Sequence, residues 1–573
     1  MIIDLYPDKA QYLTGEPVTI IAEMNEEYRY EENAGYKAVL HVIKAERLQF
    51  FCEKILTAAE IGQRTFSISF AGIDTDFGGF GADISIFRDN ECVQTFSTAF
   101  DVVSDSSRSI RYGFLSDFDT CDSDSSADVA SLSKFHINMV QYYDWSYRHD
   151  HFIAPTAVYK DMMGRKVDIK TVKNKIAACR SFGMKSIGYG AVYAASKQFY
   201  DQHPDWGLYT SAGDPLVFID AFYIMNVSRQ CPWHEHILEQ YKRAVSEVGF
   251  DGIHMDTYGF PKTAVSKFGG REELLYLENQ YPLLIEDAKK VLSDVSPDAR
   301  LIFNNVGNWP VKTVANSPQD AIYIEVWAPY ERYLHIKQII LDAKSAACVS
   351  KPIILAAYLE PFRKDLPEKA ENAAFILTAA IASNGAYHLL LGEENGVLTQ
   401  GYYVDHSFLC DTQVRRMRNY YDFIVRYLNI LYDDTLMDVS MTHIGWDNTE
   451  YQCINKEWSA YGEPDKLWLT IRENRSMKVI SLVNLCGCAD DFWNKGKDTP
   501  ITQFDVVMQI QIDRPVESVF LASPDENMGV PGMLPYVIEK TDRGAFVKIT
   551  IPEIEIWSML CIHLCEEENF HAT

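Results

Sequence analysis

The chain has 573 residues, and 80 Asp and Glu outnumber 53 Lys and Arg, which gives a formal net charge of −27 at pH 7. Such a charge repels phosphate backbones and anionic lipid surfaces, so we expect neither a nucleic-acid nor a membrane partner. Hydrophobic residues make up 47% of the chain, and no apolar run reaches the roughly 18 residues of a membrane span. The length and composition predict a globular protein of two or three domains.

The cellular compartment is predicted from the start of the chain and from its cysteines. The chain begins Met1-Ile2-Ile3-Asp4, without the basic and apolar regions of a signal peptide. The 12 cysteines are scattered, and some, such as Cys179 and Cys348, lie in apolar segments, which is typical of reduced, buried thiols. These features predict a cytoplasmic protein, or a secreted one if a leader has been trimmed.

Residues 1–105 have the pattern of an N-terminal, Ig-like β-sandwich. Short β-rich runs are expected at residues 18–22, 38–43, 65–70, 84–87 and 95–100. Turn residues such as Gly78 and Gly79 separate them at a spacing typical of sandwiches. A short polar stretch at residues 104–107 is the expected linker to the next domain.

From Arg111 onward, β-rich apolar runs alternate with amphipathic helical runs, which indicates a parallel sheet. Strands are expected at residues 112–118, 137–145, 185–193, 252–257, 301–306, 322–327, 352–359 and 387–392. Helices are expected at residues 172–182, 272–292, 332–347, 368–382 and 412–428. Eight strands alternating with helices predict a central (β/α)8 TIM barrel over residues 106–432.

The rest of the chain returns to strands. Runs at residues 467–471, 477–483, 508–512 and 545–551 predict a C-terminal antiparallel β-sandwich over residues 433–573. Between the predicted barrel strands we find no inserted β module. The residues after Glu325 lead directly into the helix expected at residues 332–347.

Two acids end predicted barrel strands that are two positions apart. Asp256 closes the fourth strand, which follows a helical run ending at Gly249, and Glu325 lies near the end of the sixth strand. Barrel enzymes carry their catalytic groups at the carboxyl ends of the strands. Asp256 and Glu325 are therefore the candidate catalytic pair. The alternative, that both are caps or ion-pair partners, is disfavoured by their places in the eight-strand pattern.

Cleavage of a glycosidic bond is a reaction that needs two carboxyl groups. One protonates the leaving oxygen, and the other meets the developing oxocarbenium ion, as a nucleophile in retaining enzymes. The acid needs a raised pKa, and the apolar neighbours of Glu325 favour that role. His254 and Tyr258 are close enough in sequence to hold Asp256 ionised through hydrogen bonds.

Further polar and aromatic residues near strand ends are candidates for binding a sugar. They are Asp117, Tyr143, Asp144, Trp145, His149, His254, Asn304 and Glu393, with Trp327, Trp309, Tyr358 and Tyr402 as candidate stacking platforms. For most of them a scaffold or core role is equally compatible with the sequence.

No pattern in the sequence indicates a metal or an organic cofactor. The stretch His234-Glu235-His236 lacks the i, i+4 spacing of a zinc helix, and Cys486-Gly487-Cys488 has the wrong spacing for a zinc knuckle. The acidic loops at residues 117–124 lack the glycine and terminal glutamate of a calcium loop. We therefore predict an enzyme without metal or cofactor.

The stretches at residues 112–118, 136–149, 250–257, 303–306, 323–327 and 390–393 resemble glycoside hydrolase family 66. This family comprises endo-dextranases and cycloisomaltooligosaccharide glucanotransferases. The resemblance extends over the predicted barrel and the flanking β domains. It implies retaining, endo-acting cleavage of α-1,6-linked glucan, with Asp256 as the nucleophile and Glu325 as the acid/base.

The resemblance is compatible with two kinds of enzyme in that family, hydrolases and cyclising transferases. The cyclising transferases carry a carbohydrate-binding module inserted in the barrel, so its expected absence here favours a dextranase-type hydrolase. A cytoplasmic enzyme would act on isomaltooligosaccharides rather than on dextran itself. A glucanotransferase, and less readily a non-catalytic glucan-binding protein, remain alternatives. The sequence does not reveal the oligomeric state.

Overall fold

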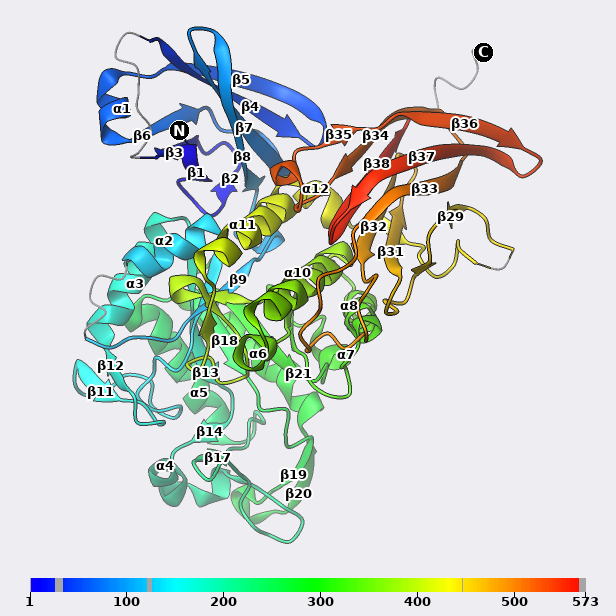
Figure 1. The fold of residues 1–573 in the computed structure, drawn as a ribbon. Helices are drawn as coiled ribbons and strands as arrows, with labels where there is room; N and C mark the ends of the chain where they lie inside the picture. The colour runs from blue at the N-terminus through cyan, green and yellow to red at the C-terminus, as the bar shows by residue number, and fades with distance from the viewer. Residues whose placement is uncertain (1, 26–33, 121–125, 446, 566–573) are drawn as a thin grey trace.

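Parallel strands form the centre of the molecule (Figure 1), and the computed structural model describes residues 2–25, 34–120, 126–445 and 447–565. The central strands are hydrogen-bonded in chain order: β9 (Tyr112–Leu115), β10 (Met139–Tyr142), β13 (Lys185–Ala191), β18 (Gly252–Asp256), β21 (Arg300–Val306), β22 (Ala321–Glu325), β23 (Ile353–Ala356) and β24 (Tyr387–His388). β25 (Leu391–Gly392) then pairs in parallel with β9, between Gly392 and Phe114. The sheet therefore returns to its first strand through residues 387–392.

Five helices lie close to the predicted positions. They are α3 (Ile169–Ser181), α6 (Leu277–Val295), α8 (Tyr333–Ala346), α10 (Pro367–Ser383) and α11 (Asp411–Arg426). α2 (Ser126–Lys134) was not predicted, and of α5 (Pro232–Arg243) only the C-terminal end was. α5 continues into a π-helical turn, Ala244–Val248, and ends at Gly249, whose φ of 99° is the left-handed geometry expected of a terminating glycine. The helix expected at residues 272–292 begins only at Leu277 because the residues before it form a strand.

Three loops at the carboxyl ends of the central strands contain short strands, and the first of them, after β10, contains β11 (Val158–Lys160) and β12 (Lys166–Asp168). The loop after β13 contains β14 (Ala194–Ala195), α4 (Lys197–Gln202), β15 (Leu208–Tyr209), β16 (Val217–Phe218) and β17 (Phe222–Ile224), and the loop after β18 contains β19 (Thr263–Ser266) and β20 (Glu273–Tyr276). The expected absence of an inserted β module between the barrel strands stays a prediction, whereas these short strands were not predicted. Strands of two to four residues are too short to show an alternating pattern.

The N-terminal residues form two sheets that share one apolar core. One sheet contains β1 (Ile2–Pro7), β3 (Val18–Met24) and β6 (Thr65–Phe70), and the other contains β2 (Tyr12–Leu13), β4 (Tyr36–Lys44), β5 (Arg47–Ile55), β7 (Phe77–Arg88) and β8 (Glu91–Val103). A short helix, α1 (Ala58–Gln63), precedes β6.

Two ion pairs connect this N-terminal region to the centre of the molecule. Arg426 of α11 forms an ion pair with Asp83 of β7 at 2.7 Å. Arg111, just before β9, forms another with Asp101 of β8 at 2.8 Å, and both of these side chains are almost fully buried. Because a buried charge without a partner is costly, these pairs make one relative placement of the two regions strongly preferred.

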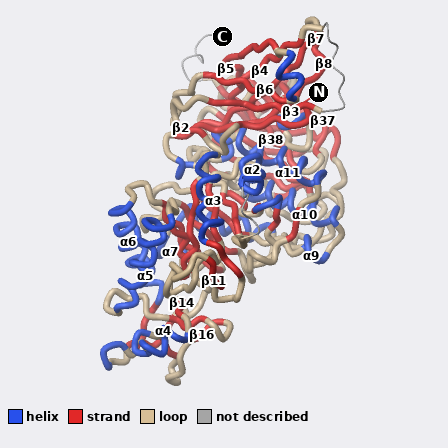
Figure 2. The backbone as a smooth tube through the Cα atoms, turned by 90° about the vertical axis from the view of Figure 1, so that its left-hand side faces the viewer, coloured by secondary structure: helices blue, strands red, loops and turns tan. Residues whose placement is uncertain are grey.

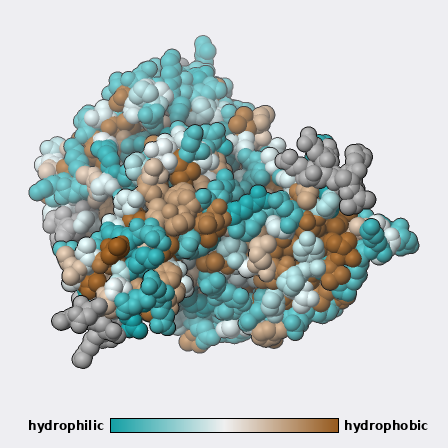
Figure 3. Space-filling model, turned by 90° about the horizontal axis from the view of Figure 1, so that it is seen from above, coloured by the Kyte–Doolittle hydropathy of each residue, from teal (hydrophilic) through white to brown (hydrophobic). Residues whose placement is uncertain are grey.

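The C-terminal residues also form two sheets around a shared core. One contains β28 (Met437–Asp438), β30 (Trp458–Ser459), β31 (Leu467–Glu473), β32 (Met477–Asn484), β34 (Val516–Ala522), β35 (Gly532–Met533) and β38 (Trp557–Leu564); the other contains β29 (Tyr451–Cys453), β33 (Gln503–Ile512), β36 (Tyr536–Thr541) and β37 (Gly544–Ile554). Seen from above, apolar side chains gather over this region, where Val537 and Ile538 of β36 are exposed (Figure 3). Both flanking regions lie at one end of the molecule, opposite the small sheets (Figure 2).

The cysteines in the described residues are free thiols, and Cys121 lies outside those residues. Cys179 is buried as expected, but Cys348 is exposed, because α8 ends at Ala346 and leaves it in a surface loop. Among the helices of the described segments, none combines the length and the apolar character needed to cross a bilayer.

Candidate active site

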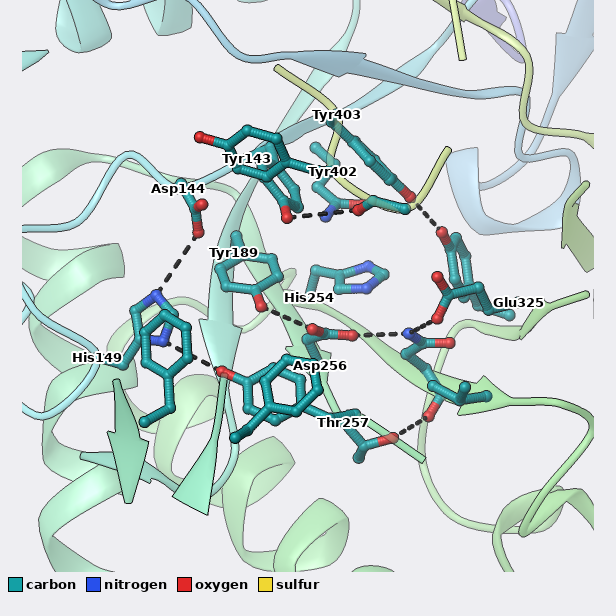
Figure 4. Close-up of a pocket in the computed structure, with 18 of the residues that line it drawn as sticks. Tyr143, Asp144, His149, Tyr189, His254, Asp256, Thr257, Glu325, Tyr402 and Tyr403 are labelled. Carbon is teal, nitrogen blue, oxygen red and sulfur yellow. Dashed lines mark hydrogen bonds and ion pairs between the residues drawn. The ribbon is translucent and has the colours of Figure 1, made fainter. Parts of the chain in front are cut away.

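A cavity of about 590 Å³ lies at the carboxyl ends of the central strands (Figure 4). Asp256 and Glu325 both line it, from the last positions of β18 and β22. The other sequence-predicted residues that line it are Tyr143, Asp144, His149, His254, Asn304, Trp327, Tyr358 and Tyr402. The parallel register explains this gathering, since strands that run in the same direction bring their final residues to one edge of the sheet.

The amide of Asn304 joins the two candidate catalytic carboxylates. Its Nδ2 donates to Asp256 Oδ1 at 2.6 Å and to Glu325 Oε2 at 3.2 Å. These two oxygens therefore lie no farther apart than the sum of the two distances, 5.8 Å. Because the two N–H bonds of an amide diverge by about 120°, the separation is about 5 Å, close to the roughly 5–5.5 Å of retaining glycosidases.

Each carboxylate also accepts a hydrogen bond from a buried tyrosine. Tyr189 of β13 donates to Asp256 Oδ2 at 2.6 Å, and Tyr358 donates to Glu325 Oε1 at 2.7 Å. Tyrosine and asparagine are neutral donors, so they orient the carboxylates without neutralising them. The two acids are therefore held in place next to each other with their charges uncompensated.

Burial raises the pKa of both carboxyl groups. The pKa of Asp256 rises to about 7 because burial disfavours its charged form and because the charge of Glu325 opposes a second one nearby. The pKa of Glu325 is also raised by burial, as its apolar neighbours led us to expect. Two carboxyl groups this close titrate as a unit, so the raised pKa belongs to the pair.

His254 and Tyr258 do not have the role expected for them beside Asp256. His254 shares a hydrogen bond with Tyr112 at 3.1 Å, and burial lowers its pKa to about 3, so its ring is neutral. The hydroxyl of Tyr258 meets His149 Nδ1 at 3.4 Å. The hydrogen bonds to Asp256 come instead from Tyr189 and Asn304.

Asp144 and His149 form a second polar group on the cavity wall (Figure 4). His149 Nε2 lies 3.5 Å from Asp144 Oδ1, which has no hydrogen-bond partner and is buried. Asp144 also has a φ of 52°, a left-handed conformation that aspartate tolerates better than most residues. A buried acceptor without a partner suits a ligand that brings a hydroxyl donor.

Three of the predicted sugar-binding residues lie outside the cavity lining. Asp117 is exposed on a loop. Trp145 is fully buried, donates to the carbonyl of Tyr189 at 3.1 Å and packs against Phe250. Glu393 accepts from the backbone N–H of Ser116 and faces the ammonium group of Lys175, as a scaffold residue would. The candidate platform Trp309 also lies outside the lining and packs on Tyr281.

Several lining residues were not selected from the sequence. They are Gln141, Met163, Tyr189, Phe218, Ile219, Phe222, Thr257, Val306, Tyr323, Gly401 and Tyr403. Tyr189 is the most important of them, because it contacts Asp256 directly. Its place in the third predicted strand, near the end that carries catalytic groups, was the available signal.

Across the described ranges, no three His, Cys, Asp or Glu side chains are grouped as a metal site would require. The absence of metal and cofactor from the chemistry remains a prediction.

Known proteins resemble this chain over most of its length. The family model for glycosyl hydrolase family 66 matches residues 7–561. A cycloisomaltooligosaccharide glucanotransferase of Niallia circulans is 22% identical over 726 aligned positions, which cover 97% of this chain and 72% of the relative. A dextranase of Streptococcus salivarius is 21% identical over 69% of this chain and 55% of its own length.

A solved structure has a similar fold over nearly the whole chain. It is a cycloisomaltooligosaccharide glucanotransferase of Paenibacillus sp. in complex with cycloisomaltoheptaose, with a TM-score of 0.87 at 21% identity, covering 98% of this chain and 99% of that one. An α-amylase of Geobacillus thermoleovorans is more distant, with a TM-score of 0.52 at 8% identity over 80% of this chain and 98% of that one. The resemblance noted in the sequence is confirmed, and the chain belongs to glycosyl hydrolase family 66.

Proposed function

We propose that this protein is a retaining, endo-acting glycoside hydrolase that cleaves α-1,6-glucosidic bonds in dextran or isomaltooligosaccharides. The observation that carries this proposal is the pair of half-buried carboxylates, Asp256 and Glu325, bridged by the single amide of Asn304 inside a cavity. We also infer that the central ring of strands is a (β/α)8 barrel and that the flanking sheets are β-sandwiches. In that architecture the two acids end the fourth and sixth strands.

The geometry fits a double displacement. In the first step Glu325 protonates the glycosidic oxygen, the bond from that oxygen to the anomeric carbon breaks, and Asp256 forms a covalent bond to the same carbon. In the second step the ionised Glu325 takes a proton from water, the water oxygen attacks the anomeric carbon, and Asp256 leaves as a carboxylate. A pair that shares one proton supplies the acid and the nucleophile together.

The cavity supports a neutral sugar as the ligand. Tyr143, Tyr402, Tyr358 and Trp327 present aromatic surface, while Asp144 and His149 present polar atoms. Pyranose rings have apolar C–H faces and hydroxyl edges, which match aromatic and carboxylate groups respectively. The relatives named above, dextranase and cycloisomaltooligosaccharide glucanotransferase, support an α-1,6-linked glucan as the substrate.

A cycloisomaltooligosaccharide glucanotransferase is the second candidate function. The relatives and the solved structure that carry this name favour it. Two observations favour the hydrolase. Only residues 326–332 link β22 to α8, and the 726 aligned positions exceed the 573 residues of this chain, so the relative carries segments within the aligned range that this chain lacks.

Analysis of the products distinguishes the two candidates. The purified protein is incubated with dextran and with isomaltooligosaccharides, and the products are separated by mass and their initial anomeric form is read by NMR. Linear products released as the α-anomer are the expected result. Cyclic products would establish the transferase, and β-anomeric products would contradict a retaining mechanism.

A further inference from the structure

The hairpin formed by β16 and β17 contributes three apolar side chains to the cavity: Phe218, Ile219 and Phe222. The two residues that flank its turn, Phe218 and Phe222, are fixed by aromatic stacking on the cavity wall. Phe218 stacks on Tyr258 with ring centres 4.4 Å apart, and Phe222 stacks on the ring of His149 at 5.0 Å. Tyr258 lies two residues beyond Asp256 in the sequence, so the turn of the hairpin is held against the wall of the candidate site.

At the tip of this hairpin, Ile219 has a left-handed backbone conformation that is unusual for isoleucine. Ala221 N–H donates to the carbonyl of Phe218 at 3.1 Å, and the two residues between them, Ile219 and Asp220, have φ values of 45° and 56°. Two positive φ values in succession are the pattern of a type I′ turn, which favours Asn, Asp or Gly. Asp220 fits this turn, whereas a β-branched isoleucine is a genuine outlier there.

Packing within the protein does not explain the isoleucine. Its side chain is 54% exposed, so little apolar burial offsets the strained backbone. Strain of this kind is concentrated at ligand-binding positions, where the side chain has a use outside the folded chain itself. Glycine or asparagine would make the same turn without strain, but neither has an apolar side chain to offer.

Other exposed apolar side chains surround the same opening. Met163 and Trp327 also line the cavity, and they are 44% and 43% exposed. Exposed apolar groups around the mouth of a polar cavity are typical of a surface that meets a ligand. The C–H faces of glucose rings are the matching chemistry, because the hydroxyl-bearing edges can then turn towards water or towards polar groups.

We propose that Ile219 is a substrate-contacting residue that makes the enzyme favour isomaltooligosaccharides long enough to reach the tip of the β16–β17 hairpin. This inference rests on the proposed function. Because Ile219 lines the cavity with 54% of its side chain exposed, it lies at the mouth and contacts a glucose unit other than the two joined by the cleaved bond. A short oligosaccharide does not extend to that position, so the contact selects for chain length.

The test compares wild type, Ile219→Ser and Asp220→Gly, with isomaltotriose and isomaltohexaose as substrates. The quantity measured is kcat/KM for each substrate, expressed as the ratio of the longer to the shorter. In Ile219→Ser we expect this ratio to fall about tenfold, the size of effect expected when an apolar contact of one side chain is lost. Asp220→Gly is the matched control, since it alters the same turn but keeps the isoleucine side chain, and its ratio should equal that of the wild type.

An unchanged ratio in Ile219→Ser would overturn the inference, and so would an equal fall in Asp220→Gly, which would assign the effect to the turn and not to the side chain. The result for the wild type separates this inference from the proposed function. A wild type that cleaves neither oligosaccharide would overturn both, whereas one that cleaves them with a ratio insensitive to Ile219 would overturn the inference alone.

Discussion

The molecule holds buried and half-buried acidic side chains in two contrasting settings. Glu393 faces the ammonium group of Lys175 at 3.2 Å and accepts hydrogen bonds from the backbone N–H groups of Ser116 and Asp117. Asp256 and Glu325 accept from tyrosine and asparagine, and within the described residues no Lys or Arg forms an ion pair with either.

Both settings lie at the carboxyl ends of central strands, so position in the fold does not separate them. What separates them is compensation of charge. A carboxylate next to a cation is stable in its ionised form and holds neighbouring loops together. A carboxylate surrounded by neutral donors keeps a raised pKa and can exchange a proton, which is a property of catalytic groups.

The sharpest test of this contrast removes the charge from each acid of the uncompensated pair. In Asp256→Asn and Glu325→Gln we expect kcat on isomaltooligosaccharides to fall by about 10³-fold or more, because nucleophile and acid/base act as a unit. Steady-state kinetics on purified, folded protein measures this. With an activated aryl glycoside, whose leaving group needs no proton, Glu325→Gln should recover its first step, while Asp256→Asn should not. Near-normal turnover in either variant on oligosaccharides would contradict the assignment.

In the compensated setting, removing the cation should affect stability. Lys175 lies between Asp128, at 2.8 Å, and Glu393. In Lys175→Met both carboxylates lose their buried partner, and we expect the free energy of unfolding to fall by about 3–5 kcal/mol. Urea denaturation followed by tryptophan fluorescence measures this. Lys197→Met, which removes an exposed ion pair with Asp201, is the control and should change stability by less than about 1 kcal/mol. Equal losses of stability in both variants would show that the buried ion pairs of Lys175 stabilise the fold no more than an exposed one does.

A smaller effect is expected from the amide that joins the two proposed catalytic carboxylates. Asn304→Ala removes both hydrogen bonds and frees the two carboxylates to move, so we expect kcat to fall by about 10–100-fold. The adjacent Asn305 donates to the backbone carbonyls of Phe303 and Tyr323, and Asn305→Ala is therefore the matched control for loss of a buried amide. Equal losses of kcat per folded molecule in both variants would contradict a specific role for Asn304 in orienting the two carboxylates.

The smallest expected effect is a shift in pH dependence. The pKa of about 7 at Asp256 belongs to loss of the last proton from the pair, so kcat/KM should decline as pH rises through about 7. Tyr189 donates to the ionised carboxylate and lowers its pKa, so Tyr189→Phe should raise that pKa and move the alkaline limb upward by about one pH unit. Tyr112→Phe, which removes a buried hydroxyl bonded to His254, should leave the limb in place. A downward shift in Tyr189→Phe would contradict the assigned direction.

The sequence predicted the features that follow from local patterns. Alternating apolar runs located the central strands, and the acids that end two of them, Asp256 and Glu325, lie together as expected. The helix terminated by Gly249 was also predicted, because a left-handed glycine is a local signal. For these elements burial and backbone geometry are encoded within a few residues.

Features that depend on partners distant in sequence could not be predicted. Glu393 ends a strand as Glu325 does, but its compensating cation, Lys175, is 218 residues away on α3. Trp145 is aromatic and near a strand end, yet it packs on Phe250 in the core. The β16–β17 hairpin has Ile219 in its turn and so lacks an Asn-Gly turn signal. Without that signal the hairpin could not be predicted from the sequence.

The ion pair between Asp83 and Arg426 also has a consequence for biosynthesis. Its two residues are separated by 343 positions, so the N-terminal region leaves the ribosome long before its partner on α11 has been translated. The N-terminal region has an apolar core of its own, but this ion pair to α11 can form only near the end of translation. Asp83 therefore lacks its ion-pair partner until Arg426 has been translated, so this contact between the two regions forms late in biosynthesis.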